Sequence, residues 1–291
     1  MLATVRSLLF APGNEERKLR GALESDADAV IADLEDAVPA AEKDRAREVV
    51  REVLREEARA PGGGGPPPER GPLREDRSPG ERRPLRLLRI AAPADVELAA
   101  ELGVDAAVVP KATAAAVRKL SGEPPVVAIV ESPIGLREAY EIASAPAVTA
   151  LMLGAVDLSV ALGLDPYGDG LELLFARSSI AVDSAAAGIG RPFDSPCLDF
   201  RDLDVVRREA ERARSLGFAG KACIHPAQVA AVNAAFTPSA KQVEWAESTL
   251  AALAEGEREG RGAVALGGTM IDEPVAAQAR GILARTRRDG G

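Results

Sequence analysis

The sequence predicts a (β/α)₈ barrel, or TIM barrel, with a small C-terminal extension. Short apolar runs alternate with longer amphipathic stretches, which is the pattern of repeated βα units. Eight such runs can be counted, and eight consecutive units favour a closed barrel over an open doubly wound sheet. Apolar residues make up 46% of the 291 residues but aromatic residues only 3%. A core of Ala, Val, Leu and Ile suits a parallel barrel covered by helices.

The expected strands follow one another along the first 224 residues. They span 5–10, 29–32, 85–90, 106–109, 126–130, 148–153, 191–193 and 219–224. Amphipathic stretches between them predict helices, most clearly at 14–25, 41–58, 171–187 and 203–216.

Two regions depart from this rhythm. Within the predicted barrel domain, 1–236, residues 60–84 include Pro61-Gly-Gly-Gly-Gly-Pro-Pro-Pro68 and predict a flexible Gly/Pro-rich surface loop. Residues 237–291 predict a separate extension: a helix over 239–255, two short runs flanking a Gly-Gly turn, and a final helix from about Pro274. This extension is a candidate for packing on a neighbouring subunit.

Composition excludes several classes of protein. The formal net charge of −9 argues against a nucleic-acid partner, whose phosphates it would repel. Cys197 and Cys223 are too few for a disulfide framework and, with one histidine, do not form a zinc pattern. Any metal should therefore be a hard cation bound by oxygen. The first apolar run is interrupted by Arg6 and no 18-residue apolar stretch occurs, so we expect a cytoplasmic protein without a membrane partner.

Charged side chains follow the predicted strands, at the end where barrels carry their catalytic groups. The most notable are Lys111, Glu131 and Asp157, which stand within otherwise apolar or tightly turned segments. The residues at these strand ends are Asp33, Glu35, Asp36, Arg89, Lys111, Glu131, Asp157, Asp194 and His225.

Glu131 and Asp157 follow consecutive strands and are 26 residues apart, about one βα unit. Neighbouring strands lie about 5 Å apart, so both carboxylates can reach one ion. Two carboxylates with waters and a chelating substrate form the usual Mg²⁺ arrangement. The alternative is that Glu131 caps a helix opening at Pro133 and Asp157 caps a short turn.

Several short segments, in the right order over nearly the whole chain, resemble the citrate lyase β-subunit family and its malyl-CoA and citramalyl-CoA lyase relatives, in the HpcH/HpaI aldolase/citrate lyase superfamily. The matching segments are Arg6-Ser-Leu-Leu-Phe-Ala-Pro-Gly13, Ala29-Val-Ile-Ala-Asp-Leu-Glu-Asp-Ala37, Val109-Pro-Lys111, Ile129-Val-Glu131-Ser, Gly154-Ala-Val-Asp-Leu158, Asp194-Ser-Pro-Cys-Leu-Asp-Phe-Arg-Asp202, Gly217-Phe-Ala-Gly-Lys-Ala-Cys-Ile-His-Pro-Ala-Gln228 and Met270-Ile-Asp-Glu-Pro274.

The resemblance implies a Mg²⁺-dependent carbon–carbon lyase that cleaves or forms a 3-hydroxyacyl-CoA. The products would be acetyl-CoA, or a close relative, and a 2-keto acid such as oxaloacetate, glyoxylate or pyruvate. It implies that Glu131 and Asp157 bind the metal, and that Glu35 and Asp36 hold metal-bound waters. It also implies a homo-oligomer, a trimer or hexamer.

The resemblance assigns further residues to the substrate and the proton. Arg89 aligns with the family's substrate arginine, which pairs with a carboxylate and stabilises the enolate oxygen; the alternative is a surface arginine. Arg6 aligns with an arginine near the same pocket. Lys111 either neutralises the anionic pocket or forms a plain salt bridge. Asp272 aligns with an aspartate that moves the proton at the acyl α-carbon, often from a neighbouring subunit; the alternative is an N-cap for the helix containing Pro274.

His225 precedes Pro226 and is either a structural residue at the barrel mouth or a catalytic base. The chain also departs from the family pattern, with Ala91-Ala92-Pro93 where Asn and a polar loop usually follow the arginine. Two other hypotheses therefore stay open. One is a catalytically degenerate barrel that binds an acyl-CoA; the other is a citrate lyase β-subunit that requires a carrier protein. A synthase or thioesterase variant also stays open within the leading hypothesis.

Overall fold

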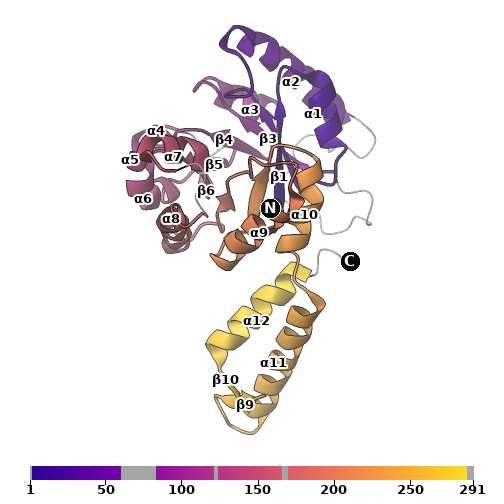
Figure 1. Ribbon diagram of the computed structural model, residues 1–291, viewed down its shortest axis with the longest axis vertical. Coiled ribbons are helices and arrows are strands. Elements are labelled where there is room, and N and C mark those ends of the chain that lie inside the picture. The colour runs from indigo at the N-terminus through magenta and orange to yellow at the C-terminus, as the bar shows by residue number, and fades with distance from the viewer. Residues whose placement is uncertain (1, 60–82, 121–123, 166–169, 287–291) are drawn as a thin grey trace. The chain divides into compact units, whose positions relative to one another are not determined.

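The computed structural model describes residues 2–59, 83–120, 124–165 and 170–286, which form two compact units (Figure 1). The first unit ends at Phe236 and the second begins at Thr237. Each unit is described by itself. Most of the predicted Gly/Pro-rich loop, residues 60–82, lies outside the described residues.

The first unit is a closed barrel of parallel strands in sequence order, so the predicted TIM barrel is confirmed. Strand β8 closes the barrel against β1, with Ser7 opposite Lys221. Each strand begins and ends within two residues of its predicted span. The strands are β1 (Ser7–Pro12), β2 (Ala29–Asp33), β3 (Leu85–Arg89), β4 (Ala106–Val109), β5 (Val126–Val130), β6 (Val148–Leu153), β7 (Phe193–Asp194) and β8 (Gly220–Cys223).

Alternate strand residues belong to two separate cores, as the two-residue period of a strand requires. Leu8, Ile31 and Met152 belong to the core that fills the barrel interior. Their chain neighbours, such as Leu9 and Val30, belong to the larger core between the strands and the helices. The interior is packed with side chains, so chemistry is confined to the loops at the ends of the strands.

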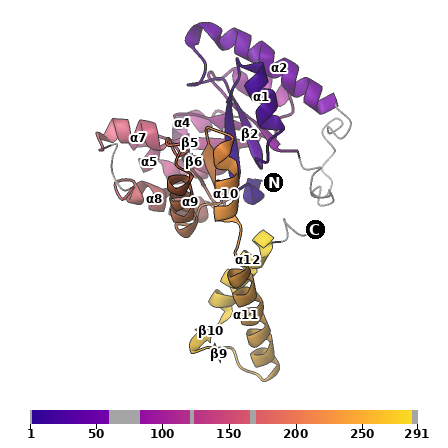
Figure 2. The same cartoon turned by 45° about the vertical axis from the view of Figure 1, so that its right-hand side comes forward.

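Helices surround the strands in the order expected for βα units (Figures 1 and 2). The long amphipathic stretches became α1, α2, α8 and α9, and shorter helices fill the remaining connections. The helices of this unit are α1 (Glu16–Leu23), α2 (Lys43–Arg59), α3 (Asp95–Glu101), α4 (Ala114–Val117), α5 (Pro133–Arg137), α6 (Ala139–Ala143), α7 (Ala155–Leu162), α8 (Leu174–Ala186), α9 (Leu203–Ser215) and α10 (Ala227–Phe236), with 3₁₀ turns at Leu2–Thr4 and Ala40–Glu42.

The second unit is a helical hairpin with a small two-stranded sheet at its tip (Figure 2). Helix α11 (Ala240–Arg258) leads to β9 (Val264–Leu266), which pairs antiparallel with β10 (Thr269–Ile271) before α12 (Glu273–Thr286). Gly267 and Gly268 have φ of 58° and 83°, which explains the Gly-Gly pair in this tight turn. Leu253, Ile271 and Ala276 form a small core of their own.

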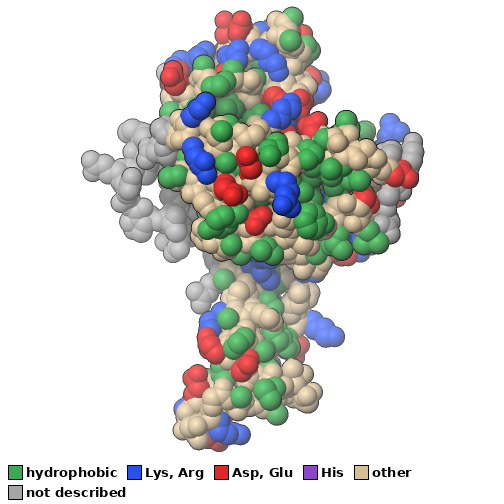
Figure 3. Space-filling view, turned by 90° about the vertical axis from the view of Figure 1, so that its left-hand side faces the viewer, with side chains coloured by type: hydrophobic (Ala, Val, Ile, Leu, Met, Phe, Trp, Pro, Cys, Tyr) green, Lys and Arg blue, Asp and Glu red, His purple; other side chains and the backbone are tan. Residues whose placement is uncertain are grey.

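Large apolar side chains are exposed on α5, α7 and α8. Ile134, Val160, Phe175 and Val182 are each more than half exposed, and Figure 3 shows the face of the first unit over which α5, α7 and α8 lie. Among the described residues, no helix combines the length and the apolar composition that a membrane crossing requires.

Candidate active site

The C-terminal ends of β2 to β6 bring together most of the site residues predicted from the sequence. Strands β2 and β3 end at Asp33 and Arg89, and β5 leads directly into Glu131. Because all strands of the barrel are parallel, these ends lie at one mouth. Contacts link Glu35, Asp36, Arg89, Lys111, Glu131 and Asp157 there.

Glu131 is a buried carboxyl group, only 5% exposed. Its Oε1 accepts a hydrogen bond from the backbone N–H of Lys111. Burial, together with the negative charges of Asp157 and Glu35, raises the pKa of Glu131 to about 7, although the hydrogen bond from Lys111 acts to lower it. The alternative role as a helix cap is wrong, because Ser132 caps α5 by accepting from the N–H of Gly135.

Asp157 lies in the first turn of α7, beside Glu131. The N-cap of this helix is Gly154, so Asp157 is not the cap. A Cβ added at Gly154 would lie 2.3 Å from the Cβ of Glu131 and 2.6 Å from its Oε2. Glycine is therefore required between β6 and α7, because the backbone passes directly against the Glu131 side chain.

Arg89 lies at the mouth, with its side chain only 11% exposed. Its Nε and one terminal nitrogen each donate to Asp33 at 2.6 Å, a bidentate pair. Its other terminal nitrogen lies 3.0 Å from Glu35 and 3.3 Å from Asp36. The guanidinium also lies 5.0 Å from the centre of the Phe10 ring. The alternative of a surface arginine is wrong, because acidic partners hold this cation in place at the site.

Lys111 has φ of 50°, in the left-handed region that non-glycine residues seldom adopt. In this conformation the backbone N–H of Lys111 donates to the Glu131 carboxylate. Its side chain reaches back across the mouth, with Nζ 2.6 Å from Glu35 and 3.9 Å from Asp36. Lys111 therefore links the two acidic pairs and partly neutralises them.

This group of charges is strongly anionic. It contains five carboxyl groups and two cations, which gives a formal charge of −3 when all are ionised. Among the described residues, no three His, Cys, Asp or Glu side chains are grouped as in a site made by protein ligands alone. Two facing carboxylates in an anionic surrounding fit Mg²⁺, which keeps water or substrate oxygens as its remaining ligands.

Arg6 does not belong to this mouth, so the prediction that it contacts the substrate is wrong. It precedes β1, at the N-terminal end of the barrel, where its side chain pairs with Asp28 at 2.9 and 3.0 Å. Asp28 directly precedes β2 and also accepts from the backbone N–H of Arg6. The pair therefore ties the starts of two neighbouring strands, the length of β1 away from the carboxylates.

Asp272 and His225 have local structural partners. The Asp272 carboxylate accepts from the N–H of Val275 at 3.2 Å, so the expected cap of α12 is present in the second unit. His225 stacks on Phe200 at 5.0 Å, and its Nδ1 accepts from the N–H of Ala227. These contacts favour the structural role for His225, whereas the proton-transfer role of Asp272 stays a prediction.

Asp33 has a role at the mouth that was not predicted from the sequence. It is 1% exposed, and besides Arg89 it accepts from the backbone N–H groups of Glu35 and Ala37. The sequence offered one indication of this role: Asp33 ends an apolar strand and is followed closely by Glu35 and Asp36. Residues 91–93, where the chain departs from the family pattern, form a tight turn. The backbone N–H groups of Ala91 and Ala92 donate there to the buried Asp95 at the start of α3.

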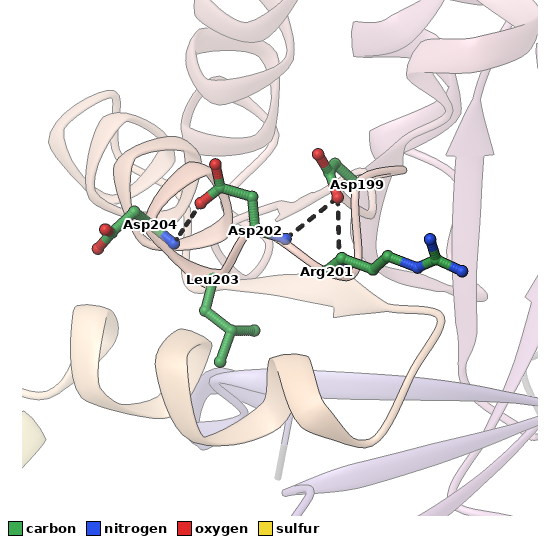
Figure 4. A pocket seen from close by; sticks show the side chains of 5 residues that line it. All are labelled: Asp199, Arg201, Asp202, Leu203 and Asp204. Atoms are coloured by element: carbon green, nitrogen blue, oxygen red, sulfur yellow. Dashed lines mark hydrogen bonds between the residues drawn. The ribbon is translucent and has the colours of Figure 1, made fainter.

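A shallow hollow on the surface lies between β7 and α9, at the start of α9 (Figure 4). Its lining residues are Asp199, Arg201, Asp202, Leu203 and Asp204. Two of its three carboxylates accept from backbone N–H groups: Asp199 from those of Arg201 and Asp202, and Asp202 from those at the start of α9. The third, that of Asp204, pairs with Arg207 at 3.2 Å. These bonds shape the turn, so the carboxylates at the mouth remain the better candidate site.

A closed (β/α)₈ barrel with paired carboxylates at its C-terminal mouth is an architecture found among barrel enzymes that use a divalent cation. The sequence model of the HpcH/HpaI aldolase/citrate lyase family matches residues 6–61 and 90–226. The chain belongs to this family.

Named relatives cover nearly the whole chain. A (3S)-malyl-CoA thioesterase from Cereibacter sphaeroides is 33% identical over 96% of this chain and 94% of its own. A citrate lyase subunit beta from Leuconostoc mesenteroides subsp. cremoris is 31% identical over 96% and 92%. A solved structure of the protein CitE from Mycobacterium tuberculosis, in complex with magnesium, acetoacetate and coenzyme A, has a TM-score of 0.78. It is 32% identical and the match covers 98% of this chain and 99% of that one.

Proposed function

We propose that this protein is a Mg²⁺-dependent carbon–carbon lyase that cleaves or forms a 3-hydroxyacyl-CoA, with acetyl-CoA or a close relative and a 2-keto acid as the other reaction partners. One observation carries the proposal: the buried Glu131 and the neighbouring Asp157 share the mouth of the barrel. Family membership and relatives bound to magnesium, coenzyme A and oxo acids support it.

Glu131 and Asp157 would hold the cation. Two like charges this close, one of them buried, are unfavourable together unless a cation or a proton joins them. Glu35 and Asp36 would accept from metal-bound waters, and their contacts with Arg89 and Lys111 keep them near the carboxylates. When bound, Mg²⁺ supplies a Lewis acid for the carboxylate and carbonyl oxygens of the keto acid.

Arg89 would bind the anionic substrate and stabilise the negative charge that develops on the thioester oxygen. Its bidentate pair with Asp33 fixes the plane of the guanidinium before substrate arrives. Lys111 would offset part of the negative charge that a carboxylate substrate meets at this mouth. Asp272, from the second unit, would move the proton at the acyl α-carbon, and packing on a neighbouring subunit in a homo-oligomer would bring it to the barrel.

A thioesterase variant is a second candidate, favoured by the name of the Cereibacter sphaeroides relative. It would use the same carboxylates but release a free hydroxy acid and a free CoA thiol. The two reactions differ in product, so a single substrate distinguishes them. A lyase converts (3S)-malyl-CoA into acetyl-CoA and glyoxylate with no free thiol.

The test incubates the purified chain with Mg²⁺ and a panel of malyl-CoA, citramalyl-CoA and citryl-CoA, and measures keto acid and free thiol separately. We expect keto acid from one thioester, and a loss of at least about 100-fold in kcat/KM for Glu131→Gln, since the change removes a metal carboxylate. Glu141→Gln, an exposed glutamate on α6, is the control and should leave the rate unchanged.

Three other outcomes would contradict the proposal of a lyase that acts on an acyl-CoA. Free thiol without keto acid would establish the thioesterase. Binding of Mg²⁺ and thioester without turnover of any panel member would favour the degenerate barrel. Product formed only when a carrier protein and companion subunits are added would favour a citrate lyase β-subunit.

A further inference from the structure

Helix α7, which carries Asp157, begins without a side-chain cap of its own. Its N-cap position is Gly154, where the close approach of Glu131 excludes any Cβ. The first N–H groups of a helix have no partner within the helix and need an outside acceptor. The residue that would normally supply this acceptor is thus forced to be glycine by the site itself.

Ser195, from the end of the neighbouring strand β7, supplies the missing acceptor. Its Oγ accepts from the N–H of Ala155, the first residue of α7, at 3.1 Å. Ser195 is 2% exposed, so water does not replace it readily. The N–H of Gly154 is bonded to the carbonyl of Val130 at 3.0 Å. Together the two bonds fix the peptide groups on either side of Gly154, directly before the first turn of α7 that carries Asp157.

The position of Ser195 is set in turn by a buried lysine. Lys221 in β8 is 1% exposed, and its Nζ donates to the carbonyl of Ser195 at 2.6 Å and to Asp194 at 2.9 Å. Glu209 on α9 lies 3.0 Å from the same Nζ, and Arg177 on α8 donates to Asp194. A fully buried lysine is costly unless all its donors are used, and this network uses them to hold one short strand end.

We infer that Ser195 is a positioning residue for the metal carboxylate Asp157, held by Lys221 and acting through the first turn of α7. This inference rests on the proposed function, because it assigns Asp157 to the metal. Without the Ser195 hydroxyl the start of α7 loses its external acceptor, and the exposed Asp157 loses its fixed place beside Glu131. Outer partners that orient a metal ligand typically change metal affinity by 10- to 100-fold.

The test measures the affinity for Mn²⁺ alone, by electron paramagnetic resonance of the free ion, in the full chain without substrate. We expect about a tenfold weaker affinity in Ser195→Ala and a smaller loss in Ser195→Thr, which keeps the hydroxyl. The loss in Ser195→Ala should stay below that in Asp157→Asn, where the carboxylate itself is gone. Ser25→Ala is the matched control: its Oγ also accepts a backbone N–H, that of Ala27, before β2 at the opposite end of the barrel.

Thermal unfolding of each variant separates positioning from general destabilisation. If both serine-to-alanine variants unfold at lower temperature but only Ser195→Ala loses Mn²⁺ affinity, the inference holds. Wild-type Mn²⁺ affinity in Ser195→Ala, or an equal loss in Ser25→Ala, would overturn it while leaving the proposed metal site intact. A wild-type chain that binds no Mn²⁺ would overturn both.

Discussion

The carboxyl group of Glu131 has a pKa of about 7, because it is buried and faces Asp157 and Glu35. In the proposed site Mg²⁺ would bind the carboxylate form, so binding below pH 7 would have to displace a proton. We expect Mg²⁺ affinity to fall by up to about tenfold per pH unit below 7, and to level off above it. Calorimetric titration with Mg²⁺ at pH 5.5, 6.5 and 7.5, in two buffers of different ionisation enthalpy, measures both the affinity and the released proton.

The same raised pKa affects stability in the opposite direction when no cation is added. The folded chain holds the Glu131 proton more tightly than the unfolded chain does, so this group's contribution is present at low pH and is lost as pH rises through about 7. Glu131→Gln should remove both pH dependences. An Mg²⁺ affinity that does not change with pH in the wild type would contradict the assignment of Glu131 as a ligand.

Residue types alone predicted most of the mouth but not how its members are held. Glu35, Asp36, Arg89, Lys111 and Glu131 lie there because each follows an apolar run, and a closed parallel barrel brings such positions together. Arg6 was misplaced because a residue that precedes a strand belongs to the other end of the barrel. The role of Ser195 could not be predicted, since its partner is 40 residues away and the contact depends on how β6 and β7 lie side by side.

At the scale of elements, the turn between β6 and α7 is the tightest constraint at the site. Gly154→Ala would place a Cβ 2.3 Å from that of Glu131, and the obstacle is the root of a buried side chain rather than a flexible end. We expect a loss of about 1–3 kcal/mol in the free energy of unfolding and a clear loss of Mg²⁺ affinity. Chemical denaturation and Mg²⁺ titration of the same variant measure the two effects.

Gly21→Ala in α1 is the control for that substitution. A Cβ there meets nothing within 4 Å, so alanine should be neutral or stabilise by up to about 1 kcal/mol through its helix propensity. Equal stability and metal affinity in Gly154→Ala and the wild type would mean that the backbone can move away from Glu131, and would weaken the case for a rigid pair of carboxylates.

Most strands of the barrel were predictable because they are buried along nearly their whole length. Strand β2 is a buried run of Ala, Val and Ile between Asp28 and its last residue, Asp33, and β5 is a buried run of Val, Ala and Ile between Pro125 and Glu131. Composition therefore marked both ends of each strand. Strand β7 is only two residues long and lies after Arg191-Pro192, which offers little periodicity, and it begins two residues later than predicted. In the second unit, the Gly267-Gly268 pair marked the hairpin because only glycine adopts both left-handed conformations readily.

At the scale of the whole molecule, the chain combines a complete barrel with a second unit that has its own small core. The homo-oligomer, a trimer or hexamer, and the cytoplasmic location stay predictions. Asp272 belongs to the second unit and the carboxylates to the first, so the proposed reaction depends on how the units of an oligomer come together. The residues of the proposed metal site, by contrast, all belong to the barrel.

A cation bound within the barrel should therefore stabilise the barrel whatever the second unit does. A ligand present at about 100 times its Kd, and bound only by the folded chain, adds about 2.7 kcal/mol to the free energy of unfolding. For a domain of this size, each kcal/mol raises Tm by about 2–4 °C, so saturating Mg²⁺ should raise the Tm of the barrel by about 5–10 °C. Calorimetric scans at pH 7.5 with Mg²⁺ and with a chelator measure the shift. Glu131→Gln should abolish it, whereas Ser195→Ala should need about tenfold more Mg²⁺ to reach the same shift. An equal Mg²⁺ response in Glu131→Gln and the wild type would show that the cation binds elsewhere, and the proposed site would then be wrong.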